Sequence, residues 1–145
     1  MATVRDLLGV KGPHVLSIGP EASVYDAAVL MNEHKIGSLV VLEAGRVQGI
    51  LTERDIMQKV VGQRRDPNMT PVREAMSSEV ICCELHTSVE EARTVMKNRR
   101  IRHMPVIDGD NRIAGIISIG DLNAHEANAQ ELTIHHLREY IYSYF

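Results

Sequence analysis

Short apolar runs separated by turn-forming residues dominate the chain, and the same order of runs occurs twice. In each half, two runs flank a glycine-containing turn, a pattern that predicts a hairpin of paired strands. Polar residues are sparse within the runs, so each strand is expected to be buried on both faces. The predicted strands cover Leu39 to Leu42 with Val47 to Leu51, and Met104 to Ile107 with Ile113 to Ile117.

An amphipathic helix is predicted before each hairpin. Ser23 and Ser88 are of a residue type that favours a helix N-cap, and Ser88 with Glu91 has the pattern of a capping box. The apolar residues that follow recur at helical spacing and define one face of each helix. They are Val24, Ala27, Ala28 and Met31 in the first half, and Val89, Ala92, Val95 and Met96 in the second.

Both halves begin with a short helical turn and a short strand, and both end with a helix. The turn is predicted at Val4 to Leu8 and Val72 to Met76, the strand at Val15 to Ile18 and Val80 to Glu84, and the last helix starts at Thr52 and Ser118. The resulting order of strand, helix, strand, strand and helix is an α/β (α+β) fold that occurs twice.

The duplication sets the expected domain boundaries. Repeat 1 covers residues 1–61, a linker with helix-breaking Gly and Pro covers 62–71, repeat 2 covers 72–126, and a C-terminal helix covers 127–145. A unit of about 60 residues buries little core by itself. We therefore expect the repeats to pack sheet against sheet as one globule with an approximate internal two-fold axis. The apolar face of the C-terminal helix needs a partner, either the first repeat or a second chain.

Composition narrows the class of protein. Of the 145 residues, 44% are hydrophobic and 24% are charged, as in an ordinary globular domain. A formal net charge of −3 argues against general nucleic-acid binding, which requires a basic face. No apolar run reaches the roughly 20 residues that span a bilayer, and no signal peptide is visible. The adjacent Cys82 and Cys83 fit neither a disulfide framework nor a zinc site, so a cytoplasmic location is expected.

Each half also carries the motif Gly-x-x-Ser/Thr-x-x-Asp where the last strand meets the last helix. Its residues are Gly49, Thr52 and Asp55 in the first half, and Gly115, Ser118 and Asp121 in the second. One interpretation is a helix cap, because a hydroxyl and a carboxylate at this spacing stabilise a helix start. The other is a ligand site, because a helix N-terminus favours phosphate and glycine lets a ligand approach the backbone. The aspartate would then hold neighbouring ribose hydroxyls.

With this repeat order and motif, the chain resembles a tandem pair of CBS domains, a family named after cystathionine β-synthase. The resemblance covers about Thr3 to Leu122, and it extends to the small stand-alone bacterial members through Leu137-Arg138-Glu139-Tyr140-Ile141. It implies a cleft between the repeats that binds an adenosine-containing ligand: AMP, ADP, ATP, NAD(H) or S-adenosylmethionine. Asp55 and Asp121 would hold ribose, and Thr52 and Ser118 would contact phosphate.

The same resemblance implies where the adenine would lie. The base would pack at the starts of the inner strands, and the first strand of the opposite repeat would close each pocket. The residues in these positions are Ile36, Gly37, Ser38, Ile101, Arg102 and His103 for the inner strands, and Val15, Leu16, Val80 and Ile81 for the closing strands.

The two pockets are expected to differ in charge. Arg102 and His103 stand where the family has a basic pair that reaches phosphate, so the second repeat's site should prefer a charged phosphate more strongly. The first repeat has Gly37 and Ser38 there, and its nearest cation is Arg54. The two arginines that precede Ile101 are interpreted as a solvated helix end.

These features favour a regulatory or sensor module that binds an adenine nucleotide and signals through a change of conformation or partner. An enzyme is less favoured, because phosphoryl transfer needs a metal-binding carboxylate cluster or a positioned base, and each site offers one acid. The remaining alternative is an interaction protein with degenerate pockets. The resemblance further implies a homodimer formed through helical faces. No metal site is predicted, and the regulated protein is not named by the sequence.

Overall fold

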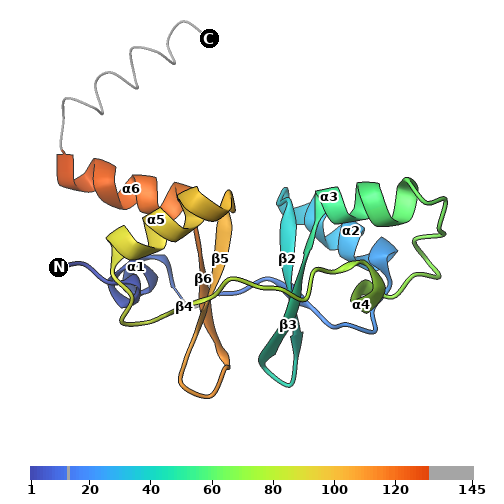
Figure 1. Cartoon of the computed structure of the whole chain (residues 1–145), viewed down its shortest axis with the longest axis horizontal. Coiled ribbons are helices and arrows are strands. Elements are labelled where there is room, and N and C mark those ends of the chain that lie inside the picture. Colours follow the sequence, from blue (N-terminus) through green and yellow to red (C-terminus); the bar gives the residue numbers. More distant parts are fainter. Residues whose placement is uncertain (13, 131–145) are drawn as a thin grey trace, which may run out of the picture.

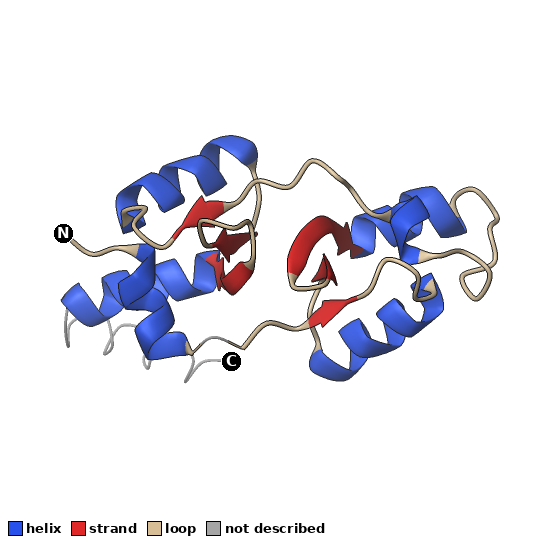
Figure 2. Ribbon diagram, turned by 90° about the horizontal axis from the view of Figure 1, so that it is seen from below, coloured by secondary structure: helices blue, strands red, loops and turns tan. Residues whose placement is uncertain are grey.

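The chain folds into two lobes, each built on one three-stranded sheet. The computed structural model describes residues 1–12 and 14–130. The sheets lie towards the centre of the molecule and the helices towards its two ends (Figure 1), and two stretches of chain pass between the lobes (Figure 2). This two-fold arrangement of mixed α and β elements confirms the predicted fold class. The apolar face predicted for the C-terminal helix falls on residues 131–145, outside the described residues.

The first sheet has the order β1-β2-β3. Strand β1 (Ser17–Ile18) runs parallel to β2 (Ser38–Glu43), which pairs antiparallel with β3 (Arg46–Thr52). The hairpin turn has positive φ at Ala44 and Gly45, 53° and 78°, which suits the right-handed twist of the strands. Three successive residues of β2, starting at Leu39, are buried as predicted. In β3 the buried Gly49 and Leu51 alternate with partly exposed residues, so the prediction of burial on both faces is wrong for that strand.

The second sheet repeats this topology in the order β4-β5-β6. Strand β4 (Cys83–Glu84) is parallel to β5 (His103–Ile107), and β5 is antiparallel to β6 (Ile113–Ser118). The first strand of each sheet is shorter than predicted, because only two of its residues pair with the neighbouring strand. The residues just before it continue as unpaired chain, and in the first repeat two of them, Val15 and Leu16, line a cavity between the lobes.

Both long helices begin at the predicted serine caps, but the structure shows only one of the two hydrogen bonds of the capping box predicted for Ser88 with Glu91. Helix α2 (Val24–His34) starts at Ser23, whose hydroxyl accepts a hydrogen bond from the Asp26 backbone N–H at 3.0 Å. Helix α5 (Val89–Arg99) starts at Ser88 with the equivalent bond from Glu91, also 3.0 Å. Each hydroxyl satisfies a backbone donor that has no partner within the helix.

The helices that follow the hairpins start where the sequence predicts them. Helix α3 (Glu53–Ile56) follows Thr52 and continues as the π-helical turn η1 (Met57–Val61). Helix α6 (Ile119–Gln130) follows Ser118. No helix within the described residues is long and apolar enough to cross a bilayer.

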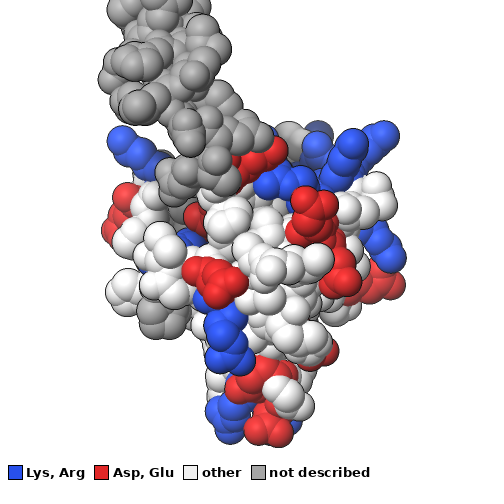
Figure 3. Space-filling model, turned by 90° about the vertical axis from the view of Figure 1, so that its left-hand side faces the viewer, with Lys and Arg blue, Asp and Glu red and all other residues white. Residues whose placement is uncertain are grey.

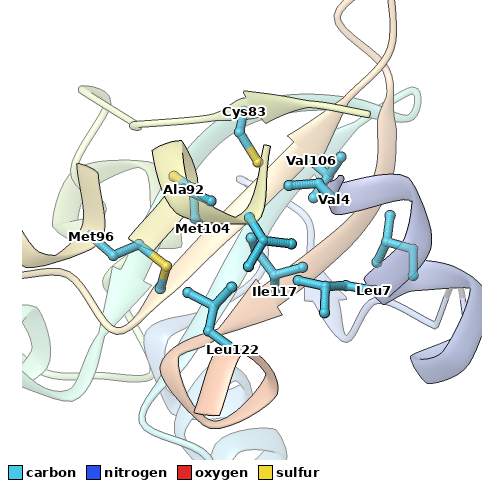
Figure 4. Close-up of a cluster of buried hydrophobic side chains, with 11 residues drawn as sticks. Val4, Leu7, Cys83, Ala92, Met96, Met104, Val106, Ile117 and Leu122 are labelled. Carbon is cyan, nitrogen blue, oxygen red and sulfur yellow. The ribbon is translucent and has the colours of Figure 1, made fainter. Parts of the chain in front are cut away.

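The lobes exchange their first helices. Helix α1 (Val4–Lys11) belongs to the first repeat in sequence, yet it packs beside α5 and α6 in the other lobe (Figure 1). Conversely, α4 (Val72–Ala75) packs in the first lobe. The core of the second lobe therefore contains three residues of α1 (Figure 4): it comprises Val4, Leu7, Leu8, Cys83, Val89, Ala92, Met96, Met104, Val106, Ile117 and Leu122.

Charges of both signs are interspersed on the end of the molecule formed by the second repeat, with no continuous basic face there (Figure 3). The formal net charge is −3.

Candidate functional site between the repeats

Both copies of the motif form a helix cap. In the first repeat, the Thr52 hydroxyl accepts from the Asp55 N–H at 3.1 Å, and the Asp55 carboxylate accepts from the Thr52 N–H at 3.0 Å. In the second, the corresponding Ser118 and Asp121 bonds are 3.1 and 2.8 Å. The capping interpretation thus holds for both repeats, and any ligand must use the atoms that the caps leave available.

The first carboxylate is enclosed by the chain itself. Asp55 is 7% exposed, and its second oxygen lies 3.2 Å from the Lys59 ammonium and accepts from the Ser77 hydroxyl at 3.4 Å. Ser77 also forms two backbone hydrogen bonds with Ile50 of β3, each 2.9 Å long. The segment after α4 therefore covers the β3 edge and the carboxylate together.

The second carboxylate is more open. The side chain of Asp121 is 25% exposed, and its partner is Lys11 at the end of α1, with Nζ 2.6 Å from Oδ2. The same ammonium donates to the Ile116 carbonyl of β6 at 2.9 Å. Partial burial raises the pKa of Asp121, but the Lys11 ammonium and the Ser118 amide outweigh it, and the net pKa is below the ordinary value. In the second repeat, the Lys11 side chain rather than a backbone segment bonds the edge of β6 and the carboxylate.

The two motif glycines do not provide the predicted approach for a ligand. A Cβ at Gly49 would lie 2.7 Å from the Met76 sulfur and from the Ser77 carbonyl oxygen, and one at Gly115 would lie 2.7 Å from a Leu8 methyl. Both glycines are instead required by the exchanged segments, which pack directly against the strands. This part of the sequence-based interpretation is wrong, because the chain's own atoms take the space.

A cavity of about 560 Å³ lies between the repeats on the open side, within the roughly 300–1,000 Å³ typical of ligand pockets. Val15 and Leu16 of the first repeat line it together with Ile116 and Ser118 of the second, the juxtaposition that the resemblance implied. The complete lining is Lys11, His14, Val15, Leu16, His34, Ile36, Ser38, His103, Ile116 and Ser118. Its walls are thus aliphatic, with cationic and hydroxyl groups among them.

A second cavity of about 350 Å³ shares Ser38 and His103 with the first, so the two cavities adjoin. Three arginines gather along it, with one carboxylate, that of Glu53. Its lining consists of Gly37, Ser38, Ile50, Thr52, Glu53, Arg54, Arg100, Ile101, Arg102 and His103. The predicted residues Gly37, Thr52, Arg54 and Ile101 are therefore brought together here.

Arg102 and His103 both line the smaller cavity, but of the two only His103 also lines the larger one. Arg102 lines the cavity that contains the first repeat's Thr52 rather than the one that contains Ser118. Burial lowers the pKa of His103, the positive charges of Lys11 and Arg102 lower it further, and Asp121 opposes them.

Several expected residues lie away from these cavities. Neither cavity is lined by Asp55, Val80, Ile81 or Asp121, and Ile81 packs against the core of the second lobe instead. Lys11 and His14 also line the larger cavity, and no sequence pattern predicts them, because only the exchange of α1 brings them beside β6.

The cysteines do not supply a nucleophile to this region. Cys83 is buried and Cys82 is partly exposed, as expected of neighbours on extended chain. Burial and the neighbouring Cys82 raise the pKa of Cys83 to about 12, so its thiol is protonated at neutral pH. Within residues 1–12 and 14–130, no three His, Cys, Asp or Glu side chains are grouped so that they could hold a metal ion.

Comparison with known proteins identifies relatives of this chain. The CBS domain model matches residues 3–62 and 72–127. The CBS domain-containing protein YhcV of Bacillus subtilis is 35% identical over 126 residues, which cover 87% of this chain and 86% of YhcV.

Similar solved structures contain the same kind of domain as the relatives found by sequence. A CBS-domain protein from Burkholderia ambifaria, to which signal transduction is ascribed, is 38% identical with a TM-score of 0.81 and covers 92% of this chain and 99% of its own. CBSX2 in complex with AMP shares the fold at 23% identity, with a TM-score of 0.75, over 90% of this chain and 100% of its own. The interlocked repeats, their capped motifs and these matches show that the chain belongs to the CBS-domain family.

Proposed function

We propose that this protein is a regulatory module that binds one adenine nucleotide, such as AMP, ADP, ATP or NAD(H), in the larger cavity between its repeats. The observation that carries the proposal is the composition of that cavity, whose aliphatic walls adjoin two serine hydroxyls, three imidazoles and the ammonium group of Lys11. A base is mostly apolar on its faces, and a phosphate requires donors, so the cavity offers both halves of a nucleotide a suitable surface.

The base would lie between Val15 and Leu16 of one repeat and Ile116 of the other. The phosphate would lie at the Ser118 hydroxyl and the amino end of α6, where the helix dipole favours an anion. A longer phosphate chain would extend towards the arginines of the adjoining cavity, which include Arg54 and Arg102. That CBSX2, a protein of the same fold, takes up AMP supports this choice of ligand.

One ligand per chain is proposed. In the first repeat, Ser77 bonds the β3 edge and Asp55 at once, so a nucleotide would have to displace backbone hydrogen bonds there. In the second repeat it would displace only a lysine side chain. Of the two copies of the motif, the one in the second repeat would then bind the ligand, and the one in the first repeat would serve only the structure.

Binding would signal because the cavity draws residues from both repeats. A ligand that contacts both repeats stabilises their present arrangement through its binding free energy.

We also propose a homodimer formed through helical faces. Exposed apolar side chains on the first lobe's helices support it: Tyr25 and Val29 on α2, and Met57 and Val61 on η1.

Isothermal titration calorimetry with AMP, ATP, NADH and GMP tests the proposal. We expect adenine nucleotides to bind at a ratio of one per chain, and GMP to bind much more weakly. Asp121→Ala and His103→Ala should weaken AMP binding, whereas the matched surface variants Asp110→Ala and His86→Ala should not. Wild-type protein that binds no adenine nucleotide, or site variants that bind as wild type does, would contradict the assignment.

Two further measurements test the alternative functions, an enzyme and an interaction protein. Incubation with ATP and Mg²⁺ followed by chromatography would reveal ADP or AMP if the cavity supported catalysis. Absence of nucleotide binding together with a stable dimer in light scattering would favour an interaction protein, for which the exposed apolar residues of α2 and η1 are the specific observation.

A further inference from the structure

Lys11 reaches the candidate site from the opposite repeat. It is the last residue of α1, where Gly12 ends the helix with a φ of 96° and an N–H bond of 2.7 Å to Leu8. Leu8 packs against Gly115 of β6, so the end of α1 is held directly beside that strand. The lysine side chain extends from there along the strand edge.

The ammonium group of Lys11 occupies the carboxylate that is proposed to hold the ribose, together with a backbone carbonyl of β6. Its hydrogen bonds to the Ile116 carbonyl and the Asp121 carboxylate are 2.9 and 2.6 Å long. A ribose that bonded Asp121 would have to displace this cation. The side chains of the pair are 32% and 25% exposed, and ion pairs in contact with solvent contribute little to stability, so a ligand can displace the ammonium group readily.

A displaced ammonium group has a new partner only when the ligand carries phosphate. Lys11 lines the same cavity as Ser118, the residue proposed to contact phosphate. An adenosine molecule would leave the lysine without an anion, whereas AMP would supply one within the same cavity. Charge-assisted bonds of this kind are about twice as strong as neutral ones.

The start of α1 is anchored independently of Lys11. The N–H groups of Val4 and Arg5 donate to the carbonyls of Thr87 and Leu85 at 2.8 and 3.0 Å, and Val89 donates to Ala2 at 3.0 Å. The helix therefore stays in place when the lysine side chain turns, and the response is confined to the end that faces the cavity.

We propose that Lys11 is a selectivity residue, which holds Asp121 until a ligand phosphate takes over its ammonium group, so that nucleotides bind in preference to nucleosides. The inference rests on the proposed function, because it concerns the same cavity. It adds a residue from the exchanged helix, and it predicts that the chain discriminates by phosphorylation as well as by base.

Calorimetry with adenosine and AMP on the wild type and on Lys11→Met tests this inference. The Lys11→Met variant keeps an apolar stem and removes the cation. We expect its AMP affinity to fall roughly tenfold, the size of one lost charge-assisted hydrogen bond, and its adenosine affinity to stay equal or rise. Lys11→Arg should keep the AMP preference, and Lys97→Met, an exposed lysine of α5 that lines neither cavity, should behave as wild type.

The outcomes separate the two proposals. Wild type that binds AMP, with an unchanged ratio of AMP to adenosine affinity in Lys11→Met, overturns the role of Lys11 alone. Wild type that binds neither ligand overturns the proposed function and this inference with it. A measurement independent of the variants is NMR of the wild type labelled with ¹³C-lysine, in which AMP and adenosine should shift the Lys11 side-chain signals differently; identical shifts would also overturn the role.

Discussion

The same motif has two different environments in one chain. Asp55 and Asp121 both cap a helix, yet Asp55 is 7% exposed whereas the side chain of Asp121 is 25% exposed. The difference arises from what each exchanged segment places beside the carboxylate, a backbone bridge at Ser77 or a lysine side chain. The same motif therefore gives an enclosed carboxylate in one repeat and a more exposed one in the other.

Removal of the lysine partner should affect the two carboxylates unequally. Lys59→Met leaves a buried carboxylate oxygen without its cation and should destabilise the fold by about 1–3 kcal/mol. Lys11→Met removes a more exposed ion pair and should cost less than about 1 kcal/mol. Urea denaturation at pH 7 measures both, and equal losses would contradict the distinction.

His103 should make stability depend on pH. Its pKa is lowered in the folded chain, first by burial and then by Lys11 and Arg102, with Asp121 opposing. The folded state thus binds a proton less readily than the unfolded state, so stability is full above the ordinary value of 6.5 and falls as the pH drops through the lowered pKa. Urea denaturation from pH 7.5 to 5 should show a steeper loss for wild type than for His103→Gln, and parallel curves would be evidence against it.

At the scale of elements, local pattern was sufficient where local interactions decide the structure. The serine caps of α2 and α5, the helix starts after Thr52 and Ser118, and the buried inner strands all follow from spacing within a few residues. The short first strands were overestimated, because an apolar run such as Val80 to Glu84 extends beyond the residues that find a pairing partner. The pattern of apolar residues shows which residues can be buried, but it does not show how many of them pair with the neighbouring strand.

The candidate site was predictable only in part for a related reason. Ser118 belongs to the recurring motif, and the resemblance to the family predicted Ser38 and His103. The structure brings all three to the larger cavity. Lys11 could not be found, because its contact with Asp121 spans 110 positions and depends on the exchange of α1. No periodicity within one repeat carries that information.

The motif glycines give a prediction about the contacts between elements. In Gly49→Ala the new methyl would meet the Ser77 backbone carbonyl, which cannot move without breaking the bridge to Ile50, so we expect a loss of about 1–3 kcal/mol. In Gly115→Ala it would meet the end of the Leu8 side chain, which can shift, so the loss should be smaller. Thermal unfolding ranks the two, with Gly109→Ala, which has open space around it, as the control.

At the scale of the whole molecule, the exchange of α1 and α4 makes each lobe depend on the other repeat. The predicted units were contiguous in sequence, whereas the second lobe's core includes residues from the first eleven positions. Sequence periodicity identifies repeats but does not show which copy of an element packs on which sheet. Neither lobe therefore has a complete core without a segment from the other half of the chain.

Shortening a core side chain of α1 should therefore destabilise both lobes together. Leu7 is 6% exposed in the second core, and Leu7→Ala should cost about 2–5 kcal/mol. Val10→Ala in the same helix, at a position that is 89% exposed, should change stability by less than about 0.5 kcal/mol. NMR signals from residues in both sheets, followed through urea denaturation, should disappear in one transition, and separate midpoints for the two lobes would show that the coupling is weak.

The crossing of helices between the lobes also bears on ancestry. A precursor with one repeat of about 60 residues and this packing would have lacked a helix that its core requires, and it could complete itself only by trading that helix with an identical neighbour. Tandem gene fusion would convert such a pair into one chain whose folding no longer depends on protein concentration. Once joined, the copies could diverge, with one retaining an open crevice while the other became scaffold.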